Sequence, residues 1–99
     1  MTDAQPLTVR LNAAERPRVA AGLVARGLDV LPSHGNFVTF DCGGPAGPVN
    51  AALLRSGVIV RPLGGYGMPR HLRVSIGRPE ENDRFLAALP EALAGVPVP

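Results

Sequence analysis

The feature that most constrains the fold is a stretch in which aliphatic and polar residues alternate. In the segment "HLRVSIG", the aliphatic residues Leu72, Val74 and Ile76 alternate with Arg73 and Ser75. Successive side chains of a β-strand point to opposite faces, so this pattern predicts a strand with one apolar and one polar face. The chain must therefore bury one side of a sheet, and Arg73 points away from the buried side.

Apolar periodicity and end signals predict three helices. They cover Asn12–Arg26, the segment from Pro48 that Gly57 closes, and a segment that begins at Pro79. In the first helix, Asn12 and Glu15 have the spacing of a capping box, and Gly27 is the predicted stop.

Two prolines fall within these helical segments. A proline inside a helix removes one hydrogen bond, and its ring clashes with the preceding turn. Because of Pro17, we expect the regular part of the first helix to begin nearer Arg16. Because of Pro90, we expect the third helix to kink or end near Leu89.

The strands complete an α-β-β-α-β-β-α order. Short β-prone runs predict strands at Leu28–Leu31, Asn36–Asp41, "VIVR" and "HLRVSIG". This order predicts an α+β fold: a small two-layer domain in which helices cover one face of a small sheet. The other face then needs a partner or tolerates water. A length of 99 residues predicts one domain, residues 1–99.

The composition argues against several classes of protein. The formal net charge is only +2, the arginines are scattered, and the chain has no tryptophan and one tyrosine, so we expect no nucleic-acid partner. No apolar run approaches the roughly 20 residues that cross a bilayer, and the start lacks the pattern of a secretory signal. Cys42 is the only cysteine, which excludes an intrachain disulfide. We therefore expect no membrane association and a cytoplasmic location.

Arg61 and Arg73 are the candidate binding residues. Each lies at the end of, or within, a β-prone run, with the glycine-rich turn "GGYG" between the two runs. A guanidinium presents a planar fork of donors that matches a carboxylate or a phosphate, and glycines let a ligand approach the backbone. On spacing alone, a solvated or salt-bridged surface arginine is the commoner alternative. Tyr66 in the turn could cover a ligand or simply be exposed.

Other catalytic or metal chemistry finds little support. His34 and His71 are far apart and have no ligand at metal spacing, so we expect no metal site. Ser33 next to His34 could suggest a nucleophile and a base, but neighbouring residues on a turn rarely face each other and no orienting acid is evident.

Three segments together resemble one enzyme family. The stretches "PSHGNFVTFD", "ALLRSGVIVRPLGGYGMPRHLRVSIG" and "PEENDRFLAAL" are similar, in one register from about Leu11 to Leu93, to the C-terminal small domain of histidinol-phosphate aminotransferases. These are fold-type-I pyridoxal-phosphate enzymes of histidine biosynthesis. The resemblance implies that Arg73 anchors the anionic group of the substrate and that Arg61 lies near it. It also implies that Asn36 lies by the substrate channel and that Tyr66 lies on the loop over the entrance.

The sequence departs from a complete aminotransferase in one decisive respect. All ten of its Lys and Arg residues are arginines, so it has no lysine to hold pyridoxal phosphate as a Schiff base. We therefore expect no cofactor in this chain, no catalytic residue and no activity alone. The resemblance implies a large pyridoxal-phosphate-binding domain or subunit as partner. The alternative is a non-catalytic module that kept the fold and uses its uncovered sheet face for interaction or self-association.

Overall fold

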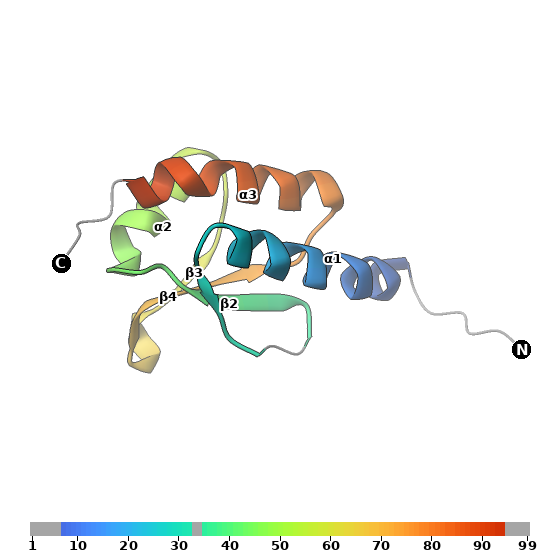
Figure 1. The fold of residues 1–99 in the computed structure, drawn as a ribbon, viewed down its shortest axis with the longest axis horizontal. Helices are drawn as coiled ribbons and strands as arrows, with labels where there is room; N and C mark the ends of the chain where they lie inside the picture. Colours follow the sequence, from blue (N-terminus) through green and yellow to red (C-terminus); the bar gives the residue numbers. More distant parts are fainter. Residues whose placement is uncertain (1–6, 33–34, 95–99) are drawn as a thin grey trace, which may run out of the picture.

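The computed structural model describes residues 7–32 and 35–94, which form two layers (Figure 1). In chain order the elements are α1 (Leu7–Ala25), β1 (Asp29–Val30), β2 (Phe37–Asp41), α2 (Ala46–Arg55), β3 (Arg61–Leu63), the 3-10 helix η1 (Gly64–Tyr66), β4 (Met68–Ser75) and α3 (Pro79–Ala94). Figure 1 shows the three α-helices on one side of the sheet. The predicted α+β class and element order are confirmed, and η1 is an addition to them.

The sheet is antiparallel throughout, with the strand order β1-β2-β4-β3. In its two central strands Val38 pairs with Val74 and Phe40 pairs with Leu72, and all four side chains are buried. They share a core with side chains from the helices, among them Val19, Leu23, Val49, Leu53, Phe85 and Leu89. Full burial of a large apolar side chain contributes about 1.5–3 kcal/mol, so this core determines which face of β4 points inward. The other face, which we call the open face, carries Arg73.

The helix α1 differs from the prediction at its start. It begins at Leu7 and passes through Pro17, so Asn12 lies inside the helix and is not its N-cap. The carbonyl that loses its partner to Pro17 belongs to Ala13, and both residues are exposed. Water can therefore satisfy that carbonyl, which explains why the proline does not start the helix.

The predicted stop of α1 is confirmed. Gly27 has a positive φ of 80°, and the N–H of Leu28 donates to the carbonyl of Leu23 at 3.1 Å. This left-handed turn is the usual glycine-dependent way to end a helix.

The helix α3 also runs past its proline. It continues to Ala94, so an end near Leu89 is wrong, and a kink at this position stays a prediction. Pro90 is exposed, whereas Leu89 before it and Ala92 after it are buried against the core. Packing on both sides of the proline therefore holds the last turns in place. At the other end, the Glu81 carboxylate accepts the Arg78 N–H at 2.8 Å and so caps the helix.

The predicted strand "VIVR" is wrong in its bounds. Residues 58–60 form no strand, and β3 begins only at Arg61. Val58 and Val60 are buried, and the Val58 N–H donates to the carbonyl of Leu53 at the end of α2. The segment is thus bound to the helix end, and its valines fill the core without pairing in the sheet.

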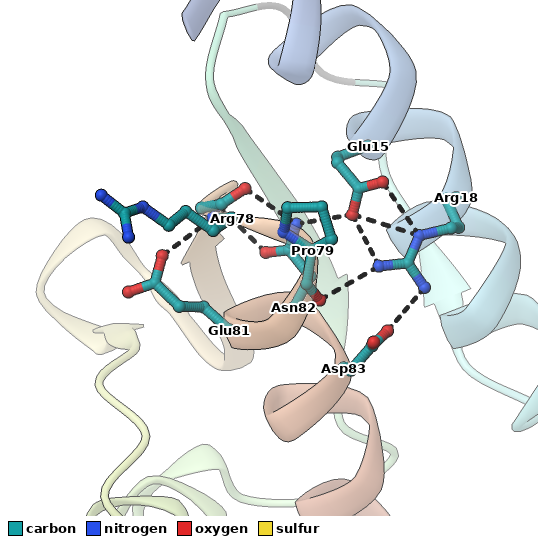
Figure 2. Close-up of polar contacts among 8 residues, drawn as sticks. Glu15, Arg18, Arg78, Pro79, Glu81, Asn82 and Asp83 are labelled. Atoms are coloured by element: carbon teal, nitrogen blue, oxygen red, sulfur yellow. Dashed lines mark hydrogen bonds and ion pairs between the residues drawn. The ribbon is translucent and has the colours of Figure 1, made fainter.

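A polar network joins α1 to the start of α3 (Figure 2). The buried Asn82 side chain donates to the Glu15 carboxylate at 3.0 Å, and it exchanges two hydrogen bonds of 3.0 Å with the N–H and carbonyl of Gly77. Arg18 binds Glu15 at 2.6 Å and Asp83 at 2.7 Å. We call these five residues the Glu15–Asn82 network. It fixes the junction between β4 and α3.

The same network explains the titration of Glu15. Hydrogen bonds from Arg18, and then from Asn82, lower the pKa of this carboxyl below its usual 4.5, because they outweigh the cost of burying its charge.

None of the described helices is long and apolar enough to cross a membrane.

Candidate functional site

Arg61 and Arg73 lie directly opposite each other in the sheet. They are Cα partners in the antiparallel pair of β3 and β4, and on its other side Arg73 is opposite Thr39 of β2. Directly opposed residues of an antiparallel pair point to the same face, with their Cβ atoms about 4.5–5.5 Å apart. Two arginines separated by eleven residues of chain thus stand side by side on the open face.

The hairpin between β3 and β4 produces this register. η1 forms the turn, in which the Gly67 N–H donates to the Gly64 carbonyl at 3.0 Å and Gly67 has a φ of 76°. The pairing shifts between Pro62 and Leu63, where the ladder is irregular. β3 is an edge strand, so Pro62 is tolerated there although it has no N–H.

The charges of the two arginines are not neutralised by an ion pair with any side chain that the structure describes. Within residues 13–32 and 35–94, no carboxylate lies within 4.0 Å of a nitrogen of Arg61 or Arg73. Like charges directly opposite each other repel, and an anion between them would remove that repulsion. Beside them is a concavity of about 430 Å³, lined by Ile59, Val60, Arg61, Pro62, Arg73 and Ser75. The arrangement is suited to binding a small anion.

Asp41, the carboxylate nearest along the strands to the arginine pair, already has partners of its own. Asp41 is opposite His71, two residues along β4 from Arg73, and its carboxylate accepts the Gly43 N–H at 2.7 Å and Arg70 Nε–H at 3.4 Å. Burial tends to raise the pKa of Asp41, but the hydrogen bond from Gly43 and the nearby Arg70 together hold it below its usual value. Asp41 is therefore engaged locally.

The other two predicted site residues lie away from the arginine pair. Asn36 precedes β2, and its carbonyl accepts the N–H of Ile76, just beyond the end of β4, at 2.7 Å. Tyr66 belongs to η1, before the start of β4, and its side chain is 70% exposed. Asn36 and Tyr66 thus lie at opposite ends of β4, and neither lines the concavity.

Three residues near the arginines were missed from the sequence. Ile59 and Ser75 line the concavity, and Arg73 Cζ lies 4.9 Å from the centroid of the Phe37 ring. Ser75 could have been found, because it shares a face with Arg73 two residues earlier. Phe37 could not, because its position depends on the pairing of β2 with β4.

Two further predictions concern the Ser33–His34 pair and a metal site. Ser33 and His34 lie outside the described residues. No three His, Cys, Asp or Glu side chains within the described part of the chain are grouped to hold a metal ion.

Comparison with known proteins gives the family. The aminotransferase class I and II family matches residues 8–89, most of the chain. The chain belongs to this family. Among its relatives, the chain is 60% identical over 86 residues to Histidinol-phosphate aminotransferase 2 of Methylococcus capsulatus and 59% identical over 85 residues to the protein of the same name from Pseudomonas aeruginosa.

The matches cover most of this chain but a small part of each relative. They include 87% and 86% of the chain, which spans only 23% of the length of either relative. The crystal structure of histidinol-phosphate aminotransferase from Sinorhizobium meliloti in complex with pyridoxal-5'-phosphate is similar with a TM-score of 0.75 and 33% identity, over 88% of this chain and 24% of that one. The chain is thus a histidinol-phosphate aminotransferase-like fragment with the fold of its structural neighbours.

Proposed function

We propose that the chain is the small domain of a histidinol-phosphate aminotransferase-like enzyme and lies C-terminal to a larger domain that binds pyridoxal phosphate. Arg61 and Arg73 then bind the anionic group of an amino-acid or amino-phosphate substrate. The observation that carries the proposal is the cross-strand pair of arginines on the open face. The identity to proteins named histidinol-phosphate aminotransferase supports this substrate class.

The arrangement of charges suits a phosphate group. Each guanidinium offers parallel N–H donors, and two forks on one face can bind different oxygens of one dianion. Such charge-assisted hydrogen bonds are stronger than neutral ones, and the repulsion between the two cations is relieved when the anion binds. The proposal therefore assigns the non-reacting, anionic end of the substrate to this chain.

The residues of this chain do not fit pyridoxal phosphate as a covalently held cofactor. Holding it as an imine requires a lysine ε-amine, and the sequence has arginine at all ten of its basic Lys and Arg positions. In the proposal the cofactor and its lysine belong to the larger domain. The chain by itself is accordingly inactive in transamination.

The partner that we propose for the open face is that larger domain. Ile59, which lines the concavity beside the arginines, is 81% exposed, which suits a surface that another domain covers. A cytoplasmic location and a role in histidine biosynthesis follow from the same proposal. Self-association through this face is the alternative, and sedimentation of the isolated chain distinguishes the two, because self-association predicts a dimer.

A chimera tests the proposed role. In the Methylococcus capsulatus relative, the matching 86 residues are replaced by those of this chain, and transamination of histidinol phosphate is measured. We expect an active enzyme in which Arg73→Ala lowers kcat/KM by about 10- to 100-fold, the loss expected for a charged hydrogen bond to substrate.

The matched control is Arg55→Ala, which removes an exposed arginine of α2, in the helical layer. It is expected to leave kcat/KM unchanged. An active chimera whose kcat/KM survives Arg73→Ala would contradict the assignment of the arginines.

A further inference from the structure

Phe37 lies next to Arg73 on the open face. β2 pairs with β4 so that Phe37 is opposite Ser75 and Thr39 is opposite Arg73. Phe37 and Arg73 are therefore diagonal neighbours on one face, at a separation that an aromatic ring and a long side chain can bridge. The side chains do bridge it, because Arg73 Cζ lies over the Phe37 ring, 4.9 Å from its centroid.

This contact leaves the donors of Arg73 available. The negative face of an aromatic ring attracts a guanidinium placed over it, but the ring accepts none of the in-plane N–H donors. No carboxylate of residues 13–32 and 35–94 pairs with Arg73. Phe37 thus holds the cation without using the hydrogen-bonding edge that an anion needs.

Phe37 has no comparable role in the core. It is half-buried and lies on the face opposite to the helices, whereas its neighbour Val38 is fully buried among them. The aromatic pair of the core is formed by Phe40 and Phe85, whose ring centroids are 5.8 Å apart. A large aromatic side chain at position 37 is therefore better explained by Arg73 than by core packing.

We propose that Phe37 is a positioning residue for anion binding, whose ring holds the Arg73 guanidinium in place on the open face before the ligand arrives. The inference rests on the proposed function of Arg73 and adds to it a residue that does not touch the ligand. Ordering a flexible side chain on binding costs free energy, and a side chain that is already held avoids part of that cost.

The first test needs no ligand. The NMR resonance of Arg73 Hε, identified by its loss in Arg73→Ala, is compared among the wild type, Phe37→Leu and Phe37→Tyr. A proton over a ring face is shifted upfield by the ring current. We expect this shift in the wild type and in Phe37→Tyr and its loss in Phe37→Leu, which keeps an apolar side chain of similar size.

The second test measures affinity for inorganic phosphate by titration of the same three proteins. A cation–π contact of this kind corresponds to a change of about three- to tenfold in affinity. We expect Phe37→Leu to bind phosphate more weakly by that factor and Phe37→Tyr to bind like the wild type. Thermal unfolding of each variant shows whether its fold is kept.

The outcomes separate this inference from the proposed function. An unshifted Arg73 Hε in the wild type overturns the inference, whether or not Phe37→Leu folds. Equal phosphate affinities of the wild type and a folded Phe37→Leu also overturn it, provided that Arg73→Ala binds more weakly. If Arg73→Ala binds phosphate like the wild type, the proposed function of Arg73 fails, and the positioning role that rests on it fails too. In that case an upfield shift of Arg73 Hε would show that the side chain contacts the Phe37 ring but not that the contact serves anion binding.

Discussion

Arg18 and Arg73 are the same side chain in opposite situations. Arg18 is part of the Glu15–Asn82 network and binds the carboxylates of Glu15 and Asp83, with a further hydrogen bond of 3.3 Å to the Pro79 carbonyl (Figure 2). Arg73 is half-buried on the open face, where it contacts a phenylalanine ring and stands opposite another arginine.

The two arginines differ in whether their N–H donors are bound by other groups of the chain. The donors of Arg18 are used within the chain, and what they stabilise is the junction of helix and strand. Those of Arg73 find no carboxylate among residues 13–32 and 35–94, although keeping two cations side by side is unfavourable. An arginine that is satisfied inside the fold serves the fold, whereas one that is left unpaired beside another suits a ligand.

The largest expected effect is a loss of stability when the Glu15–Asn82 network, in which Arg18 is satisfied, is disrupted. Asn82→Ala removes the partner of both Gly77 backbone groups and one partner of Glu15, and Asn82 is only 3% exposed. Because buried polar groups are left without partners, we expect the free energy of unfolding to fall by about 2–3 kcal/mol. Urea denaturation followed by circular dichroism measures it. A loss below about 0.5 kcal/mol would show that water replaces the amide.

The next prediction concerns the unpaired side. Arg61→Ala removes one of two facing cations and no ion pair within the described part of the chain. We expect the free energy of unfolding to stay within about 0.5 kcal/mol of the wild type or to rise slightly, while phosphate affinity falls about tenfold. The same denaturation and titration experiments measure both quantities. Destabilisation by more than about 1 kcal/mol would mean that Arg61 is structural, like Arg18.

Acid sharpens the comparison, because the satisfied side depends on the Glu15 carboxylate, which accepts hydrogen bonds from both Arg18 and Asn82. The pKa of Glu15 is lowered in the folded chain, mainly by its hydrogen bond from Arg18, so its ionised form stabilises the fold above its usual pKa of 4.5. This stabilisation is lost as the pH falls below 4.5 and through the lower, folded pKa. We expect the midpoint of urea unfolding to fall over this range.

In Glu15→Gln that fall should be smaller. Asp41 also has a lowered pKa, and its ionised form stabilises the fold in the same direction. Asp41→Asn is therefore measured in parallel, so that the share of the fall that belongs to Asp41 is separated from that of Glu15. An identical pH dependence in the wild type and Glu15→Gln would assign the acid sensitivity to other groups.

The smallest expected effect is at Tyr66. Its side chain is 70% exposed in η1, and it does not line the concavity beside the arginines. Tyr66→Phe should change the free energy of unfolding by less than about 0.5 kcal/mol and the phosphate affinity of the chain by less than about twofold. In the active chimera, a large change in KM with this variant would instead support a role that the larger domain creates.

Much of the fold could be predicted because its signals are local. The alternation around Leu72 and Val74 and the glycine after α1 both depend on neighbours in the chain. The errors occurred where packing outweighs a local preference. Pro17 and Pro90 lie within helices because their exposed sides face water while buried neighbours hold the backbone. Val58 and Val60 favour a strand, but burial at the end of α2 decides their position.

The candidate site divides in the same way. Arg61 and Arg73 could be selected from the sequence by residue type and by their place at β-prone runs, but nothing local predicts that they face each other. Their pairing depends on the irregular register of the β3–β4 hairpin, and the contact of Phe37 with Arg73 depends on a second pairing, between β2 and β4. The roles of Asn36 and Tyr66 stay predictions, and the structure places both away from the concavity.

The sequence by itself determined which residues are apolar on one face, where the helices end in glycine, and that no lysine is present. These properties follow from composition and from periods of a few residues. Only the tertiary structure decided that two arginines stand side by side with no carboxylate partner among residues 13–32 and 35–94, and that a third binds two carboxylates in a network. The physical reason is that charge pairing acts between groups brought together by strand register and helix packing, and neither is encoded in adjacent residues.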